Sequence, residues 1–251
     1  AESGAKALWT KELARALLDG EIDCSVHSMK DVETIRPAAI RIAAMLPRAA
    51  VEDRLIGAPS IDALRNNAVI GTSSPRRAAQ LKALRPDLQT TLLRGNVATR
   101  LARVQGGDIH PTLLAAAGLN RLGMSEVGTT IPVDTLLPAV AQGAVGIECR
   151  ADDAVTQAIL AAINDADTDH CVRAERAVVL ALGGSCHSPV ATLARPQGEG
   201  LFLRAQILSE DGAEQVSDEA LLSKDDLDGA MALGTRLLDR ASPALRALFA
   251  G

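Results

Sequence analysis

Aromatic side chains are almost missing from this sequence of 251 residues, which contains two Phe, one Trp and no Tyr. Proteins that bind single-stranded nucleic acid usually stack the bases on aromatic rings, so this scarcity argues against such a partner. The hydrophobic residues, 47% of the chain, must therefore build an aliphatic core. The net charge of −5 gives no long-range attraction for polyanions, so an anionic ligand has to be bound by local clusters of arginine.

Long apolar runs, paired cysteine motifs and metal-ligand spacings are missing too. No apolar stretch is long enough to span a bilayer and no signal-peptide pattern is present, so we expect a cytoplasmic protein without a membrane partner. The spacing of His170-Cys171 and Cys186-His187 matches no ordinary zinc pattern, and we predict no metal site. The cysteines form no C-x-x-C pair, which predicts reduced thiols. They are Cys24, Cys149, Cys171 and Cys186.

Apolar periodicity predicts an α/β fold followed by a C-terminal α+β unit. Strands, loops and helices alternate between Val69 and Gln105, with helix-capping residues at Ser74 and Asn96. This alternation favours a parallel sheet with crossover helices, and such sheets bind ligands at the carboxyl ends of their strands. Beyond Asp167 the pattern changes to a helix, three strands with hairpin turns between them, and a final helix.

Arginines gather on the loops of the predicted sheet. Arg76 and Arg77 fall in the first turn of a predicted helix, where the helix dipole disfavours a cation by a few tenths to about 1 kcal/mol. One interpretation is a pair of solvated arginines near acids such as Asp87. The other is a clamp in which guanidinium groups and backbone N–H groups converge on a ligand carboxylate. Arg94 and Arg100 repeat the pattern on the next strand-loop-helix unit.

Five short motifs follow one another in the chain: 26–31, 71–77, 93–97, 142–148 and 183–186. In this order they closely resemble the porphobilinogen deaminase (hydroxymethylbilane synthase) family, over nearly the whole chain. The resemblance implies two α/β domains like those of type-2 periplasmic binding proteins, which face each other across a cleft. It also implies a small C-terminal domain with an antiparallel sheet. The implied domains are residues 1–46 with 140–165, residues 47–139, and residues 166–251, and the family's opening strand has no counterpart in the sequence.

The resemblance further implies a transferase of haem biosynthesis that joins four molecules of porphobilinogen head to tail. The product would be the linear tetrapyrrole hydroxymethylbilane, and ammonia would be released. A dipyrromethane cofactor made from two substrate molecules would be attached through a thioether to Cys186. Asp31 would be the catalytic acid, which hydrogen-bonds pyrrole N–H groups and stabilises the cationic intermediate. Further cofactor contacts are implied for Asp31, Ser28, Lys30, Thr72, Ser73, Arg76 and Arg77.

Substrate carboxylates would be bound by a second set of residues. This set is Arg77, Arg94, Gly95, Asn96, Arg100 and Arg121. Taken singly, Asp31 could be a helix cap or a surface ion pair, and Arg100 and Arg121 could serve structure alone. An alternative from another class is a two-domain anion-binding protein with the same cleft and no catalysis. We expect a monomer, and we expect Arg77→Leu to leave thermal stability nearly unchanged, because a cation at a helix start is unfavourable.

Overall fold

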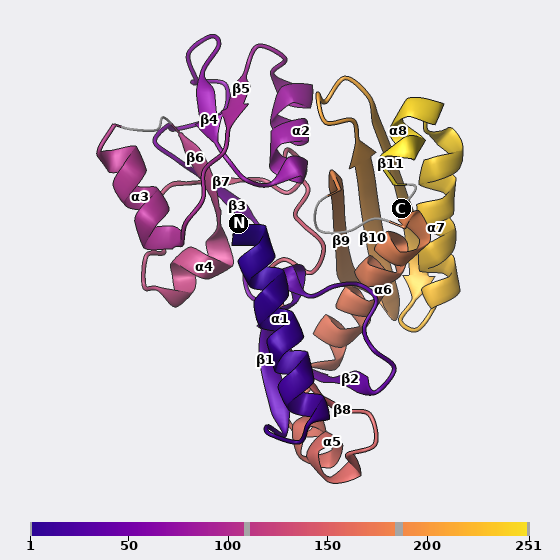
Figure 1. Ribbon diagram of the computed structural model, residues 1–251. Coiled ribbons are helices and arrows are strands. Elements are labelled where there is room, and N and C mark those ends of the chain that lie inside the picture. Colours follow the sequence, from indigo (N-terminus) through magenta and orange to yellow (C-terminus); the bar gives the residue numbers. More distant parts are fainter. Residues whose placement is uncertain (1, 108–110, 184–187, 250–251) are drawn as a thin grey trace.

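The computed structural model describes residues 2–107, 111–183 and 188–249, with side chains from Trp9 onwards (Figure 1). Their strands form a five-stranded sheet and two three-stranded sheets. The strands of each sheet come from one of the three implied domains, which are residues 1–46 with 140–165, residues 47–139, and residues 166–251. The predicted α/β class with an antiparallel C-terminal sheet is confirmed. No helix in the described ranges has the length and apolar character needed to cross a membrane.

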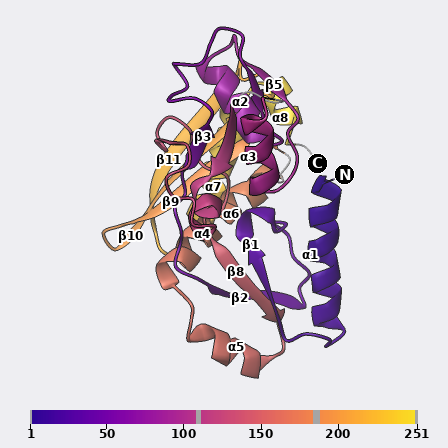
Figure 2. The same ribbon diagram turned by 90° about the vertical axis from the view of Figure 1, so that its left-hand side faces the viewer.

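The first sheet, at the bottom of Figure 1, is built from strands that are far apart in the sequence. Its elements are α1 (Glu2–Leu18), β1 (Cys24–Ser28), the 3-10 helix η1 (Met29–Asp31), β2 (Ile40–Met45), β8 (Val145–Arg150) and α5 (Ala154–Ala161). The strand order is β1-β8-β2, and β8 is antiparallel to both neighbours. Leu17 of α1 packs with Ile40 on one face, and Leu160 of α5 packs with Ile147 on the other, so the two helices cover opposite faces (Figure 2).

The second sheet mixes parallel and antiparallel strands. Its elements are β3 (Asp53–Ile56), β4 (Val69–Gly71), α2 (Pro75–Leu84), β5 (Gln89–Thr91), α3 (Val97–Gln105), β6 (Thr112–Ala115), α4 (Ala116–Arg121) and β7 (Thr129–Ile131). β4 is parallel to β5 and β6, as predicted, but β3 runs antiparallel to β6 and β7. The sequence predicted neither β3 nor β7 as a strand, and β3 adds an antiparallel part to the predicted parallel sheet. Both predicted caps are confirmed, because the side chains of Ser74 and Asn96 accept hydrogen bonds from helix N–H groups.

The first two sheets share a topology. In the order β5-β4-β6-β3-β7, the segment β6-β3-β7 has a central strand antiparallel to both neighbours, as in β1-β8-β2. β1 follows α1 in the chain just as β6 follows α3. Within the described residues β6 has strand neighbours on both edges, whereas β1 has one on a single edge. This correspondence agrees with two similar α/β units.

The C-terminal unit packs two helices on one face of an antiparallel sheet. Its elements are α6 (Ala166–Leu182), β9 (Val190–Gln197), β10 (Gly200–Leu208), β11 (Gln215–Ser223), α7 (Leu227–Arg240) and α8 (Pro243–Ala247). Alternate residues of β10, such as Leu203 and Ile207, are buried against α6 and α7. α6 also joins this unit to the rest of the molecule, because its buried Glu175 binds Arg48 with an Oε1–Nη1 distance of 2.7 Å.

Candidate active site

Asp31 lies at the end of η1, directly after strand β1, with a half-buried side chain. The backbone that follows it is held by Arg176 of α6. This guanidinium donates hydrogen bonds to the carbonyl oxygens of residues 32, 33 and 34 at 3.2, 2.6 and 3.1 Å. Burial lowers the pKa of Arg176 to about 10. Ser28 and Lys30 are also half-buried beside Asp31, so the three predicted residues of this turn lie together.

A buried carboxylate on the neighbouring strand supports the same turn. Glu148 of β8 is fully buried and accepts hydrogen bonds from Arg36 Nε at 2.7 Å and Arg36 Nη2 at 2.8 Å. His27 of β1 places its Nε2 atom 3.1 Å from Glu148 Oε2. Burial acts to raise the pKa of Glu148, but the bonds from His27 and Arg36 outweigh it and lower that pKa. These contacts fix β1 and the chain on both sides of Asp31.

The loops after β4 and β5 lie side by side at the carboxyl ends of these parallel strands. Thr72 N–H donates to the carbonyl oxygen of Thr91 at 2.9 Å. Arg100 of α3 spans both loops, since its Nε donates to Gly95 O at 2.7 Å and its Nη2 to Ser73 Oγ at 3.4 Å. The structure thus brings together four of the predicted residues, Thr72, Ser73, Gly95 and Arg100.

Gly95 allows the tight loop before α3. Its φ of +112° is unfavourable for residues with a side chain, and an added Cβ would lie 2.7 Å from Thr99 Cγ2. The Asn96 side chain accepts a hydrogen bond from Thr99 N–H at 2.9 Å and so caps α3. Arg94 and Arg121 are exposed, and neither makes a hydrogen bond or ion pair within the described part of the chain. Their guanidinium groups are therefore available to a ligand.

Arg76 and Arg77 converge on a carboxylate that the sequence did not point to. Asp53 of β3 accepts from Arg76 Nη2 at 2.7 Å, from Arg77 Nε at 3.1 Å and Nη2 at 2.6 Å, and from Gln142 Nε2 at 2.9 Å. Burial acts to raise the pKa of Asp53, but the charges of Arg77 and Arg76 hold it well below its usual range. We call Asp53, Arg76 and Arg77 the Asp53 cluster.

The Asp53 cluster excludes one interpretation of Arg76 and Arg77 and changes one expectation about Arg77. Their exposed fractions are only 3% and 7%, so they are not solvated surface arginines, and Asp87 pairs instead with Arg85 at 2.7 Å. Arg77 also donates to the carbonyl oxygen of Leu113 in β6 at 2.9 Å. It therefore ties α2 to two strands, which removes the ground for expecting that Arg77→Leu leaves stability unchanged.

Comparison with known proteins identifies the family of this chain. Residues 1–158 match the family model described as porphobilinogen deaminase, dipyromethane cofactor binding domain. Residues 170–242 match the model of the porphobilinogen deaminase C-terminal domain. The chain belongs to the porphobilinogen deaminase family.

Relatives within the porphobilinogen deaminase family are close in sequence. The chain is 55% identical to porphobilinogen deaminase of Sphingopyxis alaskensis over 256 residues, which cover 100% of this chain and 81% of the relative. It is 48% identical to the Paracoccus denitrificans enzyme of the same name, over 95% of this chain and 76% of the relative.

Solved structures give weaker similarities. A TRAP periplasmic solute binding protein from Desulfovibrio salexigens is 11% identical, with a TM-score of 0.40 over 61% of this chain and 57% of that one. The periplasmic VFT2 domain of Bordetella pertussis BvgS is 14% identical, with a TM-score of 0.36 over 61% of this chain and 66% of that one. Both scores are low, so membership of the porphobilinogen deaminase family rests on the sequence matches.

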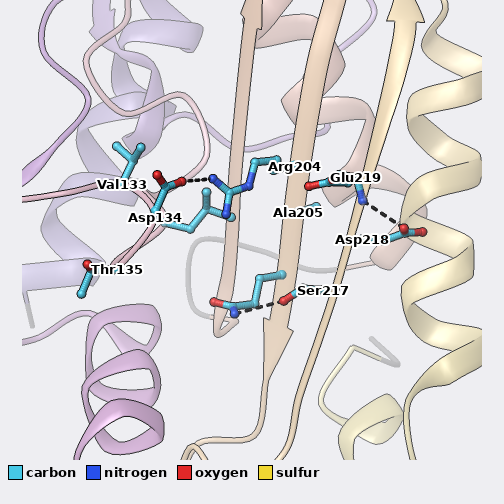
Figure 3. Close-up of a pocket in the computed structure, with 10 residues that line it drawn as sticks. Val133, Asp134, Thr135, Arg204, Ala205, Ser217, Asp218 and Glu219 are labelled. Carbon is cyan, nitrogen blue, oxygen red and sulfur yellow. Dashed lines mark hydrogen bonds and ion pairs between the residues drawn. The ribbon is translucent and has the colours of Figure 1, made fainter.

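Two features of this family member lie outside the loops described above. Cys186, predicted to carry the cofactor, falls outside the described residues. A cavity of about 250 Å³ separates the segment Val133–Thr135 from the outer face of β10 and β11 (Figure 3). An ion pair between Asp134 and Arg204 crosses it. Its lining contains none of the predicted site residues, but it borders the Asp53 cluster, because the carbonyl oxygen of its lining residue Leu137 accepts a hydrogen bond from Arg76 Nη1 at 2.7 Å.

Proposed function

We propose that this chain condenses four molecules of porphobilinogen head to tail into hydroxymethylbilane, with release of ammonia, as a transferase of haem biosynthesis. The observation that carries the proposal is the match of residues 1–158 to a dipyrromethane-cofactor-binding domain. An anion-binding protein without catalysis is less well supported, because simple binding does not need such a cofactor. The small number of aromatic residues and the net charge of −5 argue against a nucleic-acid partner. A cytoplasmic monomer without a membrane partner is part of the same proposal.

The chain's own donors suit a cofactor with several carboxylates. When bound, dipyrromethane supplies the pyrrole carbon from which the chain grows, and we assign its thioether attachment to Cys186. The Nε atom of Arg76 is buried and has no hydrogen-bond partner in the described structure. A ligand carboxylate would satisfy this donor, which otherwise costs free energy. The two guanidinium groups and one carboxylate of the Asp53 cluster sum to a charge of +1, which leaves one positive charge for an anionic ligand.

Arg94 and Arg121 are the direct contacts for substrate carboxylates in this proposal. Both are exposed: Arg94 lies on the loop between β5 and α3, and Arg121 is the last residue of α4, the helix that follows β6. Arginine's planar fork can bind a carboxylate through two parallel hydrogen bonds, which gives orientation as well as charge. Arg100 already bridges Ser73 and Gly95. Its role is to hold the two loops in register, so that Arg94 is correctly placed.

Asp31 is the catalytic residue of the proposal. Its carboxylate accepts hydrogen bonds from pyrrole N–H groups and stabilises the positive charge that develops as the substrate amine leaves. It also takes and returns a proton at successive condensation steps. Arg176 and Glu148 act as positioning residues, because they hold the backbone on either side of Asp31. A fixed carboxylate does not need to reorganise as charge develops, whereas water does.

Turnover of porphobilinogen tests this proposal. The purified chain is incubated with porphobilinogen, and released ammonia and hydroxymethylbilane are measured together. We expect both products in the ratio of four to one, and Asp31→Asn should bind substrate but reduce turnover by several orders of magnitude. Asp19→Asn is a matched control at an exposed carboxylate directly after α1 and should keep wild-type rates. Substrate binding with no ammonia release by the wild type would favour the anion-binding alternative. Unchanged turnover in Asp31→Asn would remove its catalytic role.

A further inference from the structure

Cys24 and Cys149 lie directly opposite each other on neighbouring strands. Cys24 is the first residue of β1, and the antiparallel register pairs it with Cys149 of β8. Opposite residues of an antiparallel pair project to the same face of the sheet. Neither cysteine belongs to the proposed active site, and both thiols are free.

The hydrogen-bond pattern shows that Cys24 and Cys149 form a non-hydrogen-bonded pair of the ladder between β1 and β8. Met29 N–H donates to Ala144 O at 3.1 Å, which makes 29 and 144 a hydrogen-bonded pair. Because hydrogen-bonded and non-hydrogen-bonded pairs alternate, the pair of Cys24 and Cys149, five positions away, is non-hydrogen-bonded. On the other side of β8, Ala151 N–H donates to Ala39 O at 2.9 Å, so 151 and 149 direct their backbone groups toward β2. The hydrogen bonds on the two edges of β8 therefore both indicate that Cys24 and Cys149 are a non-hydrogen-bonded pair.

Non-hydrogen-bonded pairs have the separation that a disulfide needs. Their Cα atoms are about 4.5 Å apart, and disulfides span Cα distances of about 4.4–6.8 Å. In hydrogen-bonded pairs the side chains are further apart, so a shift of register by one residue would weaken the fit. The expected Cα separation of Cys24 and Cys149, and the common face to which their side chains project, both allow a cross-strand disulfide without movement of the backbone.

The two thiols differ in access to solvent. Cys24 is exposed, and Val26 on the same face of β1 is 58% exposed. Cys149 is fully buried, in a cluster with Ile147 and Leu160 of α5. A reagent in solution therefore meets Cys24 first, with Cys149 as the adjacent second thiol. Burial, together with Asp153, raises the pKa of the Cys149 thiol, which slows the second step without blocking it.

We infer that Cys24 and Cys149 form a reversible cross-strand disulfide when the protein meets a small-molecule disulfide such as oxidised glutathione. Cys24 thiolate attacks one sulfur of the reagent, forms a mixed disulfide and releases one thiolate. Cys149 thiolate then attacks Cys24 sulfur, closes the intramolecular bond and releases the second thiolate. The two protons lost by the cysteines are taken up by the two leaving thiolates, so protein thiols are oxidised and the reagent is reduced. The bond fixes β1, which leads into the Asp31 turn, to the central strand of its sheet.

Disulfide mapping of the folded protein tests this inference. The native chain is treated with oxidised glutathione at mildly alkaline pH, free thiols are blocked, and peptides are mapped by mass spectrometry without reductant. We expect a peptide pair joined through Cys24 and Cys149, which disappears after treatment with dithiothreitol. Cys171 is the internal control, because burial raises its pKa to about 12 and it should stay reduced.

Single variants separate the possible outcomes. Cys24→Ser should abolish the linked peptide pair and leave Cys149 reduced, whereas Cys171→Ser should leave the pair intact. Circular dichroism of each variant verifies that the test is made on folded protein. Glutathione retained on Cys24 without an internal bond would overturn the inference, and so would a link from Cys24 to any other cysteine.

Discussion

Replacing Asp53 by Asn keeps the side-chain size but removes the only carboxylate bound by Arg76 and Arg77 in the described structure. Two buried guanidinium groups would then repel each other without a counter-charge. Breaking a buried ion pair in this way costs about 3–5 kcal/mol. For a chain of 150–250 residues each kcal/mol lowers the unfolding temperature by about 2–4 °C, so we expect a fall of about 6–20 °C.

Thermal unfolding followed by circular dichroism measures this effect. Asp87→Asn is the matched control, because Asp87 binds Arg85 at the surface and its removal should cause a much smaller fall. The pKa of Asp53 is lowered in the folded state, so its contribution is complete above its unfolded pKa of about 3.9 and is lost as the pH falls below that value. The difference between wild type and Asp53→Asn should therefore shrink in acid. Equal falls for the two variants at neutral pH would refute the structural role of the Asp53 cluster.

Further predictions concern Arg94, Arg77 and Gly95. Arg94→Leu should raise KM or stop chain elongation while the unfolding temperature stays near wild type, and Arg94→Lys should recover only part of the activity because it lacks the fork. Arg77→Leu should instead lower the unfolding temperature by several degrees, because it breaks the buried ion pair with Asp53. A stable Arg77→Leu variant would contradict the assignment of Arg77 to structure and of Arg94 to ligand binding. Gly95→Ala should reduce substrate affinity more than Gly20→Ala, since only Gly95 would place a Cβ against a neighbouring side chain. Equal KM values for these two glycine variants would argue against a strained, ligand-facing loop.

Local signals in the sequence predicted the loops of the site well. The predicted capping residues Ser74 and Asn96 fixed the starts of α2 and α3, which begin at Pro75 and Val97. The reason is that a cap acts through hydrogen bonds within three residues, such as the one that Arg77 N–H donates to Ser74 Oγ. The alternating segments also placed Thr72, Ser73 and Gly95 on neighbouring loops, and Arg100 of α3 connects these loops through hydrogen bonds.

Contacts between distant segments could not be predicted in this way. β3 carries Asp53 and Arg54 within four residues, so its charges conceal the apolar pattern of a strand. Asp53 and Arg77 are 24 positions apart in the sequence. They meet only because β3 lies beside β6 in the sheet. The support of the Asp31 turn by Arg176 likewise joins residues 142 to 144 positions apart. Residue type alone could not decide whether Arg77 faces solvent or a ligand. In the fold its partner is Asp53, which neither interpretation included.

The intact mass of the purified protein tests the central claim most directly. We predict that it exceeds the sequence mass by one dipyrromethane unit, and that Cys186→Ala removes this excess together with activity. Cys171→Ala, at a buried cysteine of α6, should keep both. An unmodified wild-type protein that still converts porphobilinogen would contradict the account, as would a Cys186→Ala variant that retains the added mass.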